Sequence, residues 1–313
     1  MRYLSFLAFC LIITLMSCQQ EKPAKKEIKE IKEIKDFKSS IKSVKGIRYT
    51  EVKRRFSNGL SFDTTGFQQE PSWIIEFYSA DTILAWDPVQ QKMQGFHLHY
   101  DHKDVYNFAK EWFRFKSVNK DSLVFQRLQV NDKAIADDIR SDVNMTFYAD
   151  SYIKKLHTSA ADLQRPSKAD TTFIKQMIDR AERNPTNADS VFAGRIPVQL
   201  IPRDNRIQVE KISTVDRLNG RTEAYDYLYP RFRIVIPGAY KDFGYEFNVL
   251  VDSAGKMRLG KFYMNMDEYK ETRKKVLQGI IDVYFANLLI IKPGTTLGLP
   301  HSSEITVSVK GKK

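Results

Sequence analysis

An apolar segment near the N-terminus contains or adjoins both cysteines of this chain. Cys10 lies inside the segment Tyr3–Met16, Cys18 follows it closely, and no other cysteine occurs among the 313 residues. A permanent membrane-spanning helix needs roughly 20 apolar residues, so this shorter segment is typical of a cleaved targeting sequence. The chain that follows has no second thiol and therefore no internal disulfide. We expect a hydrophobic core alone to hold it together.

The apolar segment ends in Leu15-Met16-Ser17-Cys18, a pattern of aliphatic, variable, small and cysteine residues that follows the basic start Met1-Arg2. This pattern resembles the lipobox of bacterial lipoproteins. The resemblance implies that residues 1–17 are a signal peptide and that Cys18 carries the lipid that anchors the protein in the cell envelope. Gln19 at the next position favours the outer membrane, facing the periplasm or the exterior. An ordinary secretory signal with a chance cysteine is the alternative.

Residues 18–45 are predicted to be a charged tether behind the lipid. The stretch Glu21–Lys45 has nine lysines against four glutamates and one aspartate, and Glu27–Lys35 repeats a Glu-Ile-Lys triplet. Apolar residues at every third position drift around a helix of about 3.6 residues per turn, which makes a poor coiled-coil seam. The rest of the +12 net charge is spread among mixed-sign residues. Without a dense basic stripe interleaved with aromatics, we expect no nucleic-acid partner.

The body behind the tether is predicted to be α+β, with a β-rich antiparallel module over residues 46–131. Its hydrophobic content of 42% is that of a globular protein. Short segments rich in aromatic and β-branched residues predict strands. These segments are Tyr49–Phe56, Trp73–Tyr78, Thr82–Trp86, Trp112–Val118 and Leu123–Val130. A meander or a small barrel fits this pattern, and a lipocalin-like barrel for a small apolar ligand is one such shape.

Residues 132–313 are predicted to form an α+β module that ends in a hairpin, a helix and a strand. Asp170 is the expected N-cap of a helix over Thr171–Arg183. Strands are expected at Val191–Ile201, Arg206–Ile212 and Arg231–Ile236. A hairpin pairs Tyr245–Val251 with Met257–Met264 around Gly255. A capping box at Asn265–Glu268 starts a helix with Tyr269, Val276, Ile280, Tyr284 and Leu288 on one face, and Ile305, Val307 and Val309 alternate in a closing strand.

The order from about Tyr240 to Val309, a hairpin turning on Asp-x-x-Gly-Lys, a helix, a Pro-Gly loop and a final strand, resembles the C-terminal domain of TonB-type periplasmic proteins. The resemblance implies binding of protein partners by strand addition at a sheet edge. The resemblance assigns no functional role to any residue of this chain. A sheet covered by one helix leaves at least one edge open. Lys310, Lys312 and Lys313 beyond the last strand could guard that edge or attract an acidic peptide.

One cluster could carry chemistry, namely His97, His99, Asp101 and His102. Its H-x-H-x-D-H pattern resembles the metal-binding motif of metallo-β-lactamase-fold hydrolases, in which paired ions supply hydroxide. That resemblance asks for further histidines, for which His157 and His301 are available, and for a bridging carboxylate. The candidates for that carboxylate are Asp162, Asp170 and Asp179. The alternative is an antiparallel strand on which the histidines face solvent while Phe96, Leu98 and Tyr100 face a core.

Other catalytic signatures are absent from the sequence: it has no Walker or Rossmann glycine loop, no G-x-S-x-G elbow and no H-E-x-x-H. His301, Ser302, Ser303 and Glu304 adjoin only in sequence, and we interpret them as a polar turn. We therefore predict a membrane-anchored binding or envelope-associated module, with an envelope protein or polymer as partner, no cofactor and no enzymatic activity. The rival hypothesis is a metal-dependent hydrolase that uses the histidine cluster.

Overall fold

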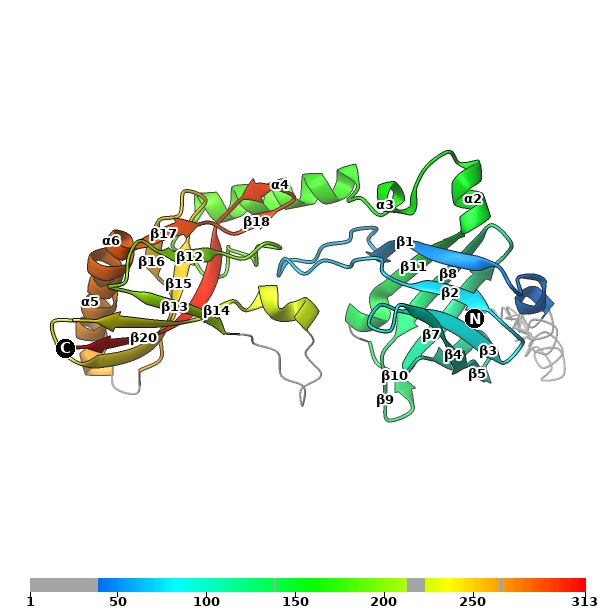
Figure 1. The fold of residues 1–313 in the computed structure, drawn as a ribbon, viewed down its shortest axis with the longest axis horizontal. Helices are drawn as coiled ribbons and strands as arrows, with labels where there is room; N and C mark the ends of the chain where they lie inside the picture. Colours follow the sequence, from blue (N-terminus) through cyan, green and yellow to red (C-terminus); the bar gives the residue numbers. More distant parts are fainter. Residues whose placement is uncertain (1–38, 138, 213–222, 265–266) are drawn as a thin grey trace, which may run out of the picture.

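The computed structural model describes residues 39–137, 139–212, 223–264 and 267–313. The signal segment, Cys18 and most of the tether lie outside these ranges, as do the first two residues of the predicted capping box. The described chain is rich in strands and belongs to a mixed α+β class, as predicted. Figure 1 shows two lobes, each built on its own sheet, with helix α4 extending from one lobe to the other.

The N-terminal lobe is a curled antiparallel sheet of nine strands in the order β4-β3-β2-β1-β11-β8-β7-β6-β5. Its strands are β1 (Arg48–Phe56), β2 (Ile74–Phe77), β3 (Thr82–Asp87), β4 (Lys92–His97), β5 (His99–His102), β6 (Val105–Phe108), β7 (Glu111–Val118), β8 (Ser122–Leu128) and β11 (Val143–Ala149). A small side hairpin joins β9 (Val130–Asn131) to β10 (Ala134–Ile135). Five predicted strands thus lie in one sheet.

The sheet curls almost into a barrel because its two edge strands are neighbours in the chain. Only Leu98, which is buried, separates β4 from β5, yet these strands form no ladder with each other. The inner face is filled by stacked aromatic rings, with Phe115 and Phe125 at 4.1 Å and Tyr106 and Phe115 at 4.4 Å between centroids. The result is a near-barrel with one open seam, between β4 and β5.

The predicted module boundary after Asn131 lies before the last strand of this sheet. Strand β11 pairs with β1 on one side and with β8 on the other, so it is a central strand. Met145, Phe147 and Ala149 of β11 are buried in the same core as the earlier strands. The N-terminal lobe therefore continues to Ala149, because strand pairing across the sheet overrides the change in composition along the chain.

Three helices follow, α2 (Asp150–Lys155), α3 (Ala160–Leu163) and α4 (Lys168–Arg183). The prediction that Asp170 is the N-cap of α4 is wrong by three residues. Ser167 is the N-cap, and Asp170 occupies the third helical position, where its carboxylate accepts the Ser167 backbone N–H and completes a capping box. The predicted helix began one turn late because Ser167 and Asp170 both carry side chains that can cap.

The C-terminal lobe has a five-stranded sheet in the order β13-β14-β20-β15-β16. Its strands are β13 (Gln208–Ile212), β14 (Arg231–Pro237), β15 (Phe243–Val251), β16 (Met257–Leu259) and β20 (Ser303–Lys312). The predicted closing strand is thus central, parallel to β14 and antiparallel to β15. Two short ladders complete the lobe, β12 (Gln199–Pro202) with β17 (Leu289–Lys292) and β18 (Thr295–Thr296) with β19 (Leu299–Pro300). Of the strand predicted over Val191–Ile201, only the end forms β12.

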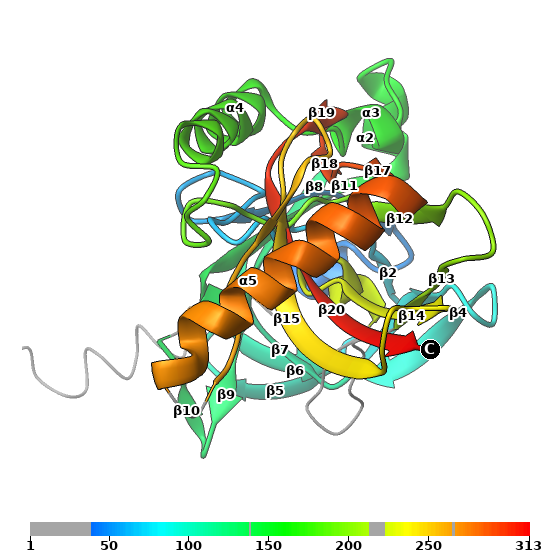
Figure 2. The ribbon, with the colours of Figure 1, turned by 90° about the vertical axis from the view of Figure 1, so that its left-hand side faces the viewer.

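One helical segment covers a single face of this sheet (Figure 2). It consists of α5 (Lys270–Ile280), a π-helical turn (Ile281–Phe285) and α6 (Ala286–Leu288). Its buried residues are Leu277, Ile280, Ile281, Phe285 and Leu288. The predicted face was partly wrong: Tyr269 is 52% exposed, because it lies in a 3-10 turn (Asp267–Tyr269) ahead of α5 and not within the α-helix.

The lobes meet at the loop that follows β1 and the segment that follows α4. Phe62 and Phe192 pack with Ile174 and Met177 of α4 in a small separate core. Arg195 pairs with Glu70 at 2.6 Å and lies over the ring of Tyr227 at 4.5 Å. This junction contains both apolar and charged contacts.

Candidate functional site

The C-terminal sheet has an open edge along the first half of β15. Strand β16 pairs only with Val249–Val251, so it leaves the stretch Phe243–Phe247 without a neighbour on that side. The predicted strand Met257–Met264 ends early for a local reason. The Asn248 C=O accepts from Gly260 N–H and the Asn248 N–H donates to the Lys261 C=O, both at 2.8 Å. Gly260 and Lys261 therefore both lie opposite the single residue Asn248. This is the pattern of a β-bulge, which bends the chain away from its partner strand.

The open edge presents backbone groups ready to form hydrogen bonds. Asn248 directs its N–H and C=O toward the β16 side. Along a β-strand, the backbone N–H and C=O groups of every second residue point to the same side. Glu246 and Gly244 therefore point theirs outward. Within the described ranges, neither residue forms a backbone hydrogen bond on that side. Backbone groups left unpaired along a strand edge are a template for another strand.

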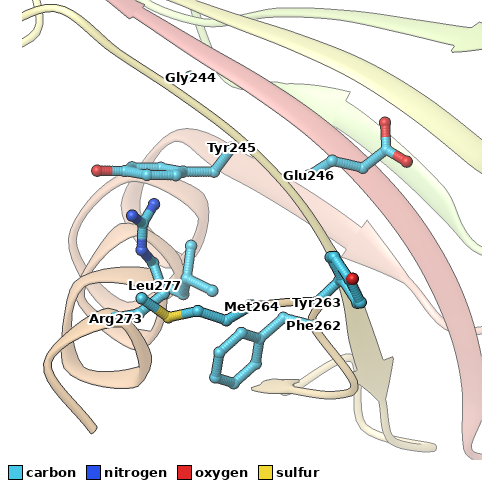
Figure 3. A pocket seen from close by; sticks show the side chains of 8 residues that line it. All are labelled: Gly244, Tyr245, Glu246, Phe262, Tyr263, Met264, Arg273 and Leu277. Atoms are coloured by element: carbon cyan, nitrogen blue, oxygen red, sulfur yellow. The ribbon is translucent and has the colours of Figure 1, made fainter. Parts of the chain in front are cut away.

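A groove of about 440 Å³ runs beside this edge. Figure 3 shows β15 above it, the segment Phe262–Met264 below it and helix α5 at the left. Its lining residues are Gly244, Tyr245, Glu246, Phe262, Tyr263, Met264, Arg273 and Leu277. The walls are mainly aromatic and aliphatic, and Tyr263 is 90% exposed. The bulge that ends β16 thus separates the hairpin arms far enough to leave a hollow between them.

Arg273 is the cation at the centre of the groove. The carbon of its guanidinium lies 4.6 Å from the ring centre of Tyr245, a cation–π distance. Figure 3 shows the guanidinium next to this ring, with nitrogen atoms directed toward it. Of the carboxylates in the described chain, none lies within ion-pair distance of Arg273. The nearby Glu246 instead binds Arg231 at 2.6 Å. A half-buried guanidinium therefore lies in the groove without a carboxylate partner among the described residues.

A row of aromatic side chains extends the groove along the sheet. Phe243 stacks on Tyr245 with ring centres 5.7 Å apart, and it also contacts Tyr284 at 6.2 Å. Phe243 lies over Gly311, where an added Cβ would come within 2.3 Å of its ring. Gly311 thus provides the space that lets Phe243 support Tyr245, and Tyr245 in turn supports Arg273.

The sequence-predicted histidine cluster occupies the seam of the other lobe. His97 ends β4 and His99 starts β5, with ring centres 6.2 Å apart, and both are exposed. His102 contacts Asp101 through Nδ1 at 2.5 Å. Leu98 is buried, while Phe96 and Tyr100 pack against the core, as the solvated-strand alternative predicts. The interruption at Leu98 divides the single predicted strand between two sheet edges.

The structure does not bring the other predicted ligands to this cluster. His157 is exposed after α2, and His301 is fully buried in the C-terminal lobe, stacked on Phe192 at 3.8 Å. Asp162 accepts a hydrogen bond from the hydroxyl of Ser159, the N-cap of α3, and Asp179 is exposed on α4. Across the described ranges, no three His, Cys, Asp or Glu side chains gather closely enough to hold a metal ion.

Three of the four residues of the C-terminal polar turn, His301, Ser302 and Ser303, are buried. His301 Nε2 contacts Thr296 Oγ1 at 2.9 Å, and its Nδ1 donates to the Ser302 C=O at 3.1 Å. Burial lowers the pKa of His301, so the ring is neutral and Thr296 donates to it. The hydroxyls of Ser302 and Ser303 are buried and form no hydrogen bond with His301. These residues pack the turn before β20.

A second hollow, of about 590 Å³, opens at the end of the near-barrel beside its seam. Trp73, Phe96 and Ala85 provide apolar walls, and Ala109 of the β6–β7 turn also lines the hollow. Gln94 Nε2 donates to Asp87 at 2.8 Å and forms a polar rim. The sequence predicted a barrel but offered no signal for this cavity, because its walls come from four separate segments.

Comparison with protein-family models gives no match, and neither does comparison with curated proteins. Among the described residues, none of the helices combines the length and apolar character needed to cross a membrane. Neither the open edge nor Arg273 was singled out from sequence, although the prediction of one unpaired edge pointed to this sheet. The available signal was Gly260 within the second arm of the hairpin, where a bulge interrupts a strand.

Proposed function

We propose that the C-terminal lobe binds an extended segment of a partner protein, which adds as a strand to the open edge of β15. The observation that carries this proposal is the pair of outward-facing residues Gly244 and Glu246 beside a preformed groove. Main-chain hydrogen bonds would supply affinity, and the groove would select side chains on one face of the added strand.

The dimensions of the groove support an added strand. Neighbouring strands lie about 4.8 Å apart, and the 440 Å³ hollow between β15 and Phe262–Met264 leaves room for one strand with a large side chain. The floor is α5, which already covers this face of the sheet (Figure 2). An added strand would continue the layer that α5 covers. The resemblance of residues 240–309 to TonB-type domains points to the same mode of binding.

We also propose that Cys18 is lipidated and holds this binding lobe at the cell envelope, with the outer membrane as the favoured site. The support is the lipobox pattern and the charged spacer behind it. The described body begins at residue 39, so about 20 residues separate the lipid from the first lobe. Fully extended, such a spacer reaches about 70 Å at roughly 3.4 Å per residue. The partner would then be another envelope protein or polymer-bound protein.

The experiment selects random phage-displayed peptides on the full-length protein in detergent and measures their dissociation constants by fluorescence anisotropy. Gly244→Pro removes the outward N–H, whereas Gly244→Ala keeps it, and an added Cβ meets nothing within 4 Å. We expect Gly244→Pro to weaken binding at least tenfold and Gly244→Ala to leave it within twofold. Bound peptide should also protect the Gly244 and Glu246 amides from hydrogen exchange. Equal binding by both variants, or no selected peptide, would refute strand addition.

A second candidate function rests on the hollow at the seam of the near-barrel. Its apolar walls and sparse polar rim are typical of a small-molecule site. We propose an acyl chain as the ligand, with Gln94 and Asp87 at the mouth. A dansyl-labelled fatty acid should bind the wild-type protein and Met93→Glu, which alters the outer face of β4. Phe96→Glu, on the inner face, should abolish binding. Equal binding by the two variants would exclude this cavity.

A further inference from the structure

We infer that Arg273 binds a carboxylate of the added strand, so that the partner segment carries an acidic residue facing α5. This inference rests on the proposed strand addition and specifies the chemistry of the partner. Its basis is the placement of a free guanidinium within the same groove as the open backbone edge.

The surroundings of Arg273 leave its charge available. Tyr245 contacts the guanidinium from one side, and Arg273 itself lines the groove. Among the described residues, no carboxylate pairs with its N–H groups. A planar guanidinium binds a carboxylate through two parallel hydrogen bonds. Glu246, the carboxylate among the lining residues, is paired with Arg231. Partial burial strengthens such an ion pair by lowering the local dielectric constant.

The charge of α5 reinforces this preference. Its exposed side includes Lys274 and Lys275 next to Arg273, against the single acidic residue Glu271. This cationic excess attracts an acidic segment and disfavours a basic one. Acidic peptides should therefore associate faster at low salt than neutral ones.

The rest of the groove fixes a second position of the partner. Alternate residues of a strand point to the same face, about 6.8 Å apart. Beside Arg273, the same face of the groove is lined by Leu277, Phe262 and Met264, which suit an apolar side chain. The partner sequence should therefore place an acidic residue and a large apolar residue two positions apart. The order of the two would reveal the direction of the added strand.

The test uses the peptides selected above on the full-length protein. We expect them to be enriched in an acidic residue two positions from an apolar one. For a peptide with this acidic residue as Glu, Arg273→Gln should raise the dissociation constant at least tenfold and Arg273→Lys severalfold. For the same peptide with Gln, both variants should bind like the wild type. Lys274→Gln, which changes an exposed charge on the same helix, should have less than a threefold effect on either peptide.

The outcomes separate this inference from the proposal beneath it. Peptides that depend on Gly244 but show no acidic preference would overturn the role of Arg273 and leave strand addition standing. An equal loss for the Glu and Gln peptides in Arg273→Gln would have the same meaning, because it would indicate a role in packing against Tyr245. If no displayed peptide binds, strand addition fails and the carboxylate contact fails with it. Unchanged melting temperatures of the variants will confirm that all are folded.

Discussion

Replacing Asp170 with Asn should destabilise the protein strongly, because this buried carboxylate joins three separate segments. Asp170 is 0% exposed. It accepts hydrogen bonds from Arg55 of β1 at 2.8 Å, from the Ser61 N–H at 2.7 Å and from the Ser167 N–H and hydroxyl at 2.7 Å. The NH2 group of an Asn side chain would face hydrogen-bond donors that the carboxylate now accepts from. The positive charge of the Arg55 guanidinium would also lose its negatively charged partner. Breaking a buried ion pair on one side costs about 3–5 kcal/mol.

The same contacts predict how stability depends on pH. Burial alone raises the pKa of Asp170, but the hydrogen bonds from Ser61, Arg55 and Ser167 outweigh it and lower the pKa to about 2 from 3.8. A lowered folded-state pKa gives stability that is complete above about pH 4 and is lost as the pH falls toward 2. At roughly 1.4 kcal/mol per pKa unit, this ionisation contributes about 2.5 kcal/mol.

Urea denaturation of wild type and Asp170→Asn at pH 7, 5 and 3, followed by circular dichroism, measures both effects. We expect a loss of about 3 kcal/mol or more at pH 7 that narrows by pH 3, because the carboxyl of the unfolded wild-type chain is then mostly protonated while the folded one stays ionised. The matched control is Asp179→Asn on the exposed side of the same helix, which should change stability by less than about 0.5 kcal/mol. An unchanged midpoint at pH 7, or a pH-independent difference, would contradict this account of α4.

Four further outcomes follow from the features described above. Cys18→Ala should move the protein to the soluble fraction and abolish incorporation of labelled palmitate; unchanged fractionation and labelling would refute lipidation. His99→Ala should change the free energy of unfolding by less than about 1 kcal/mol, because the ring is exposed. Elemental analysis of the wild-type protein should find well under one zinc per chain. One zinc per chain in the wild type that is lost in His99→Ala would restore the hydrolase hypothesis. Truncation after Ser303 removes the strand between β14 and β15 and should unfold the C-terminal lobe in thermal melts; a cooperative melt at the original temperature would show the sheet does not need it. Gly311→Val should displace Phe243 and weaken selected peptides severalfold without touching the groove directly; unchanged affinity would exclude support through Phe243.

Local patterns predicted the elements whose residues interact with near neighbours in the chain. The hairpin of β15 and β16 was expected from its turn, and Gly255 does adopt a φ of 81°. Strand β1 was expected over Tyr49–Phe56 and forms over Arg48–Phe56. In these cases, alternation and turn chemistry act within a few residues, and a single sequence contains that information.

Features that depend on distant pairing could not be predicted in this way. The central place of β11 depends on its ladders with β1 and β8, and its own composition did not distinguish it from the helical region that follows. The seam at Leu98 likewise depends on the curvature of all nine strands. In the candidate site, the contact between Arg273 and Tyr245 depends on how α5 crosses the sheet. Arg273 and Tyr245 belong to different elements, and no sequence pattern predicts that they are in contact.

The position of β11 sets the order in which the N-terminal lobe can be completed during synthesis. Strands β1–β4 and β5–β8 are two four-stranded meanders, each built from consecutive strands. The final strand must enter between β1 and β8, and its register joins Tyr49 to Ala149. Until about 150 residues have emerged, both meanders therefore keep a hydrophobic inner edge unpaired. Such unpaired edges promote aggregation. A chaperone that prevents β1 and β8 from pairing with each other or with other chains would therefore act at this stage.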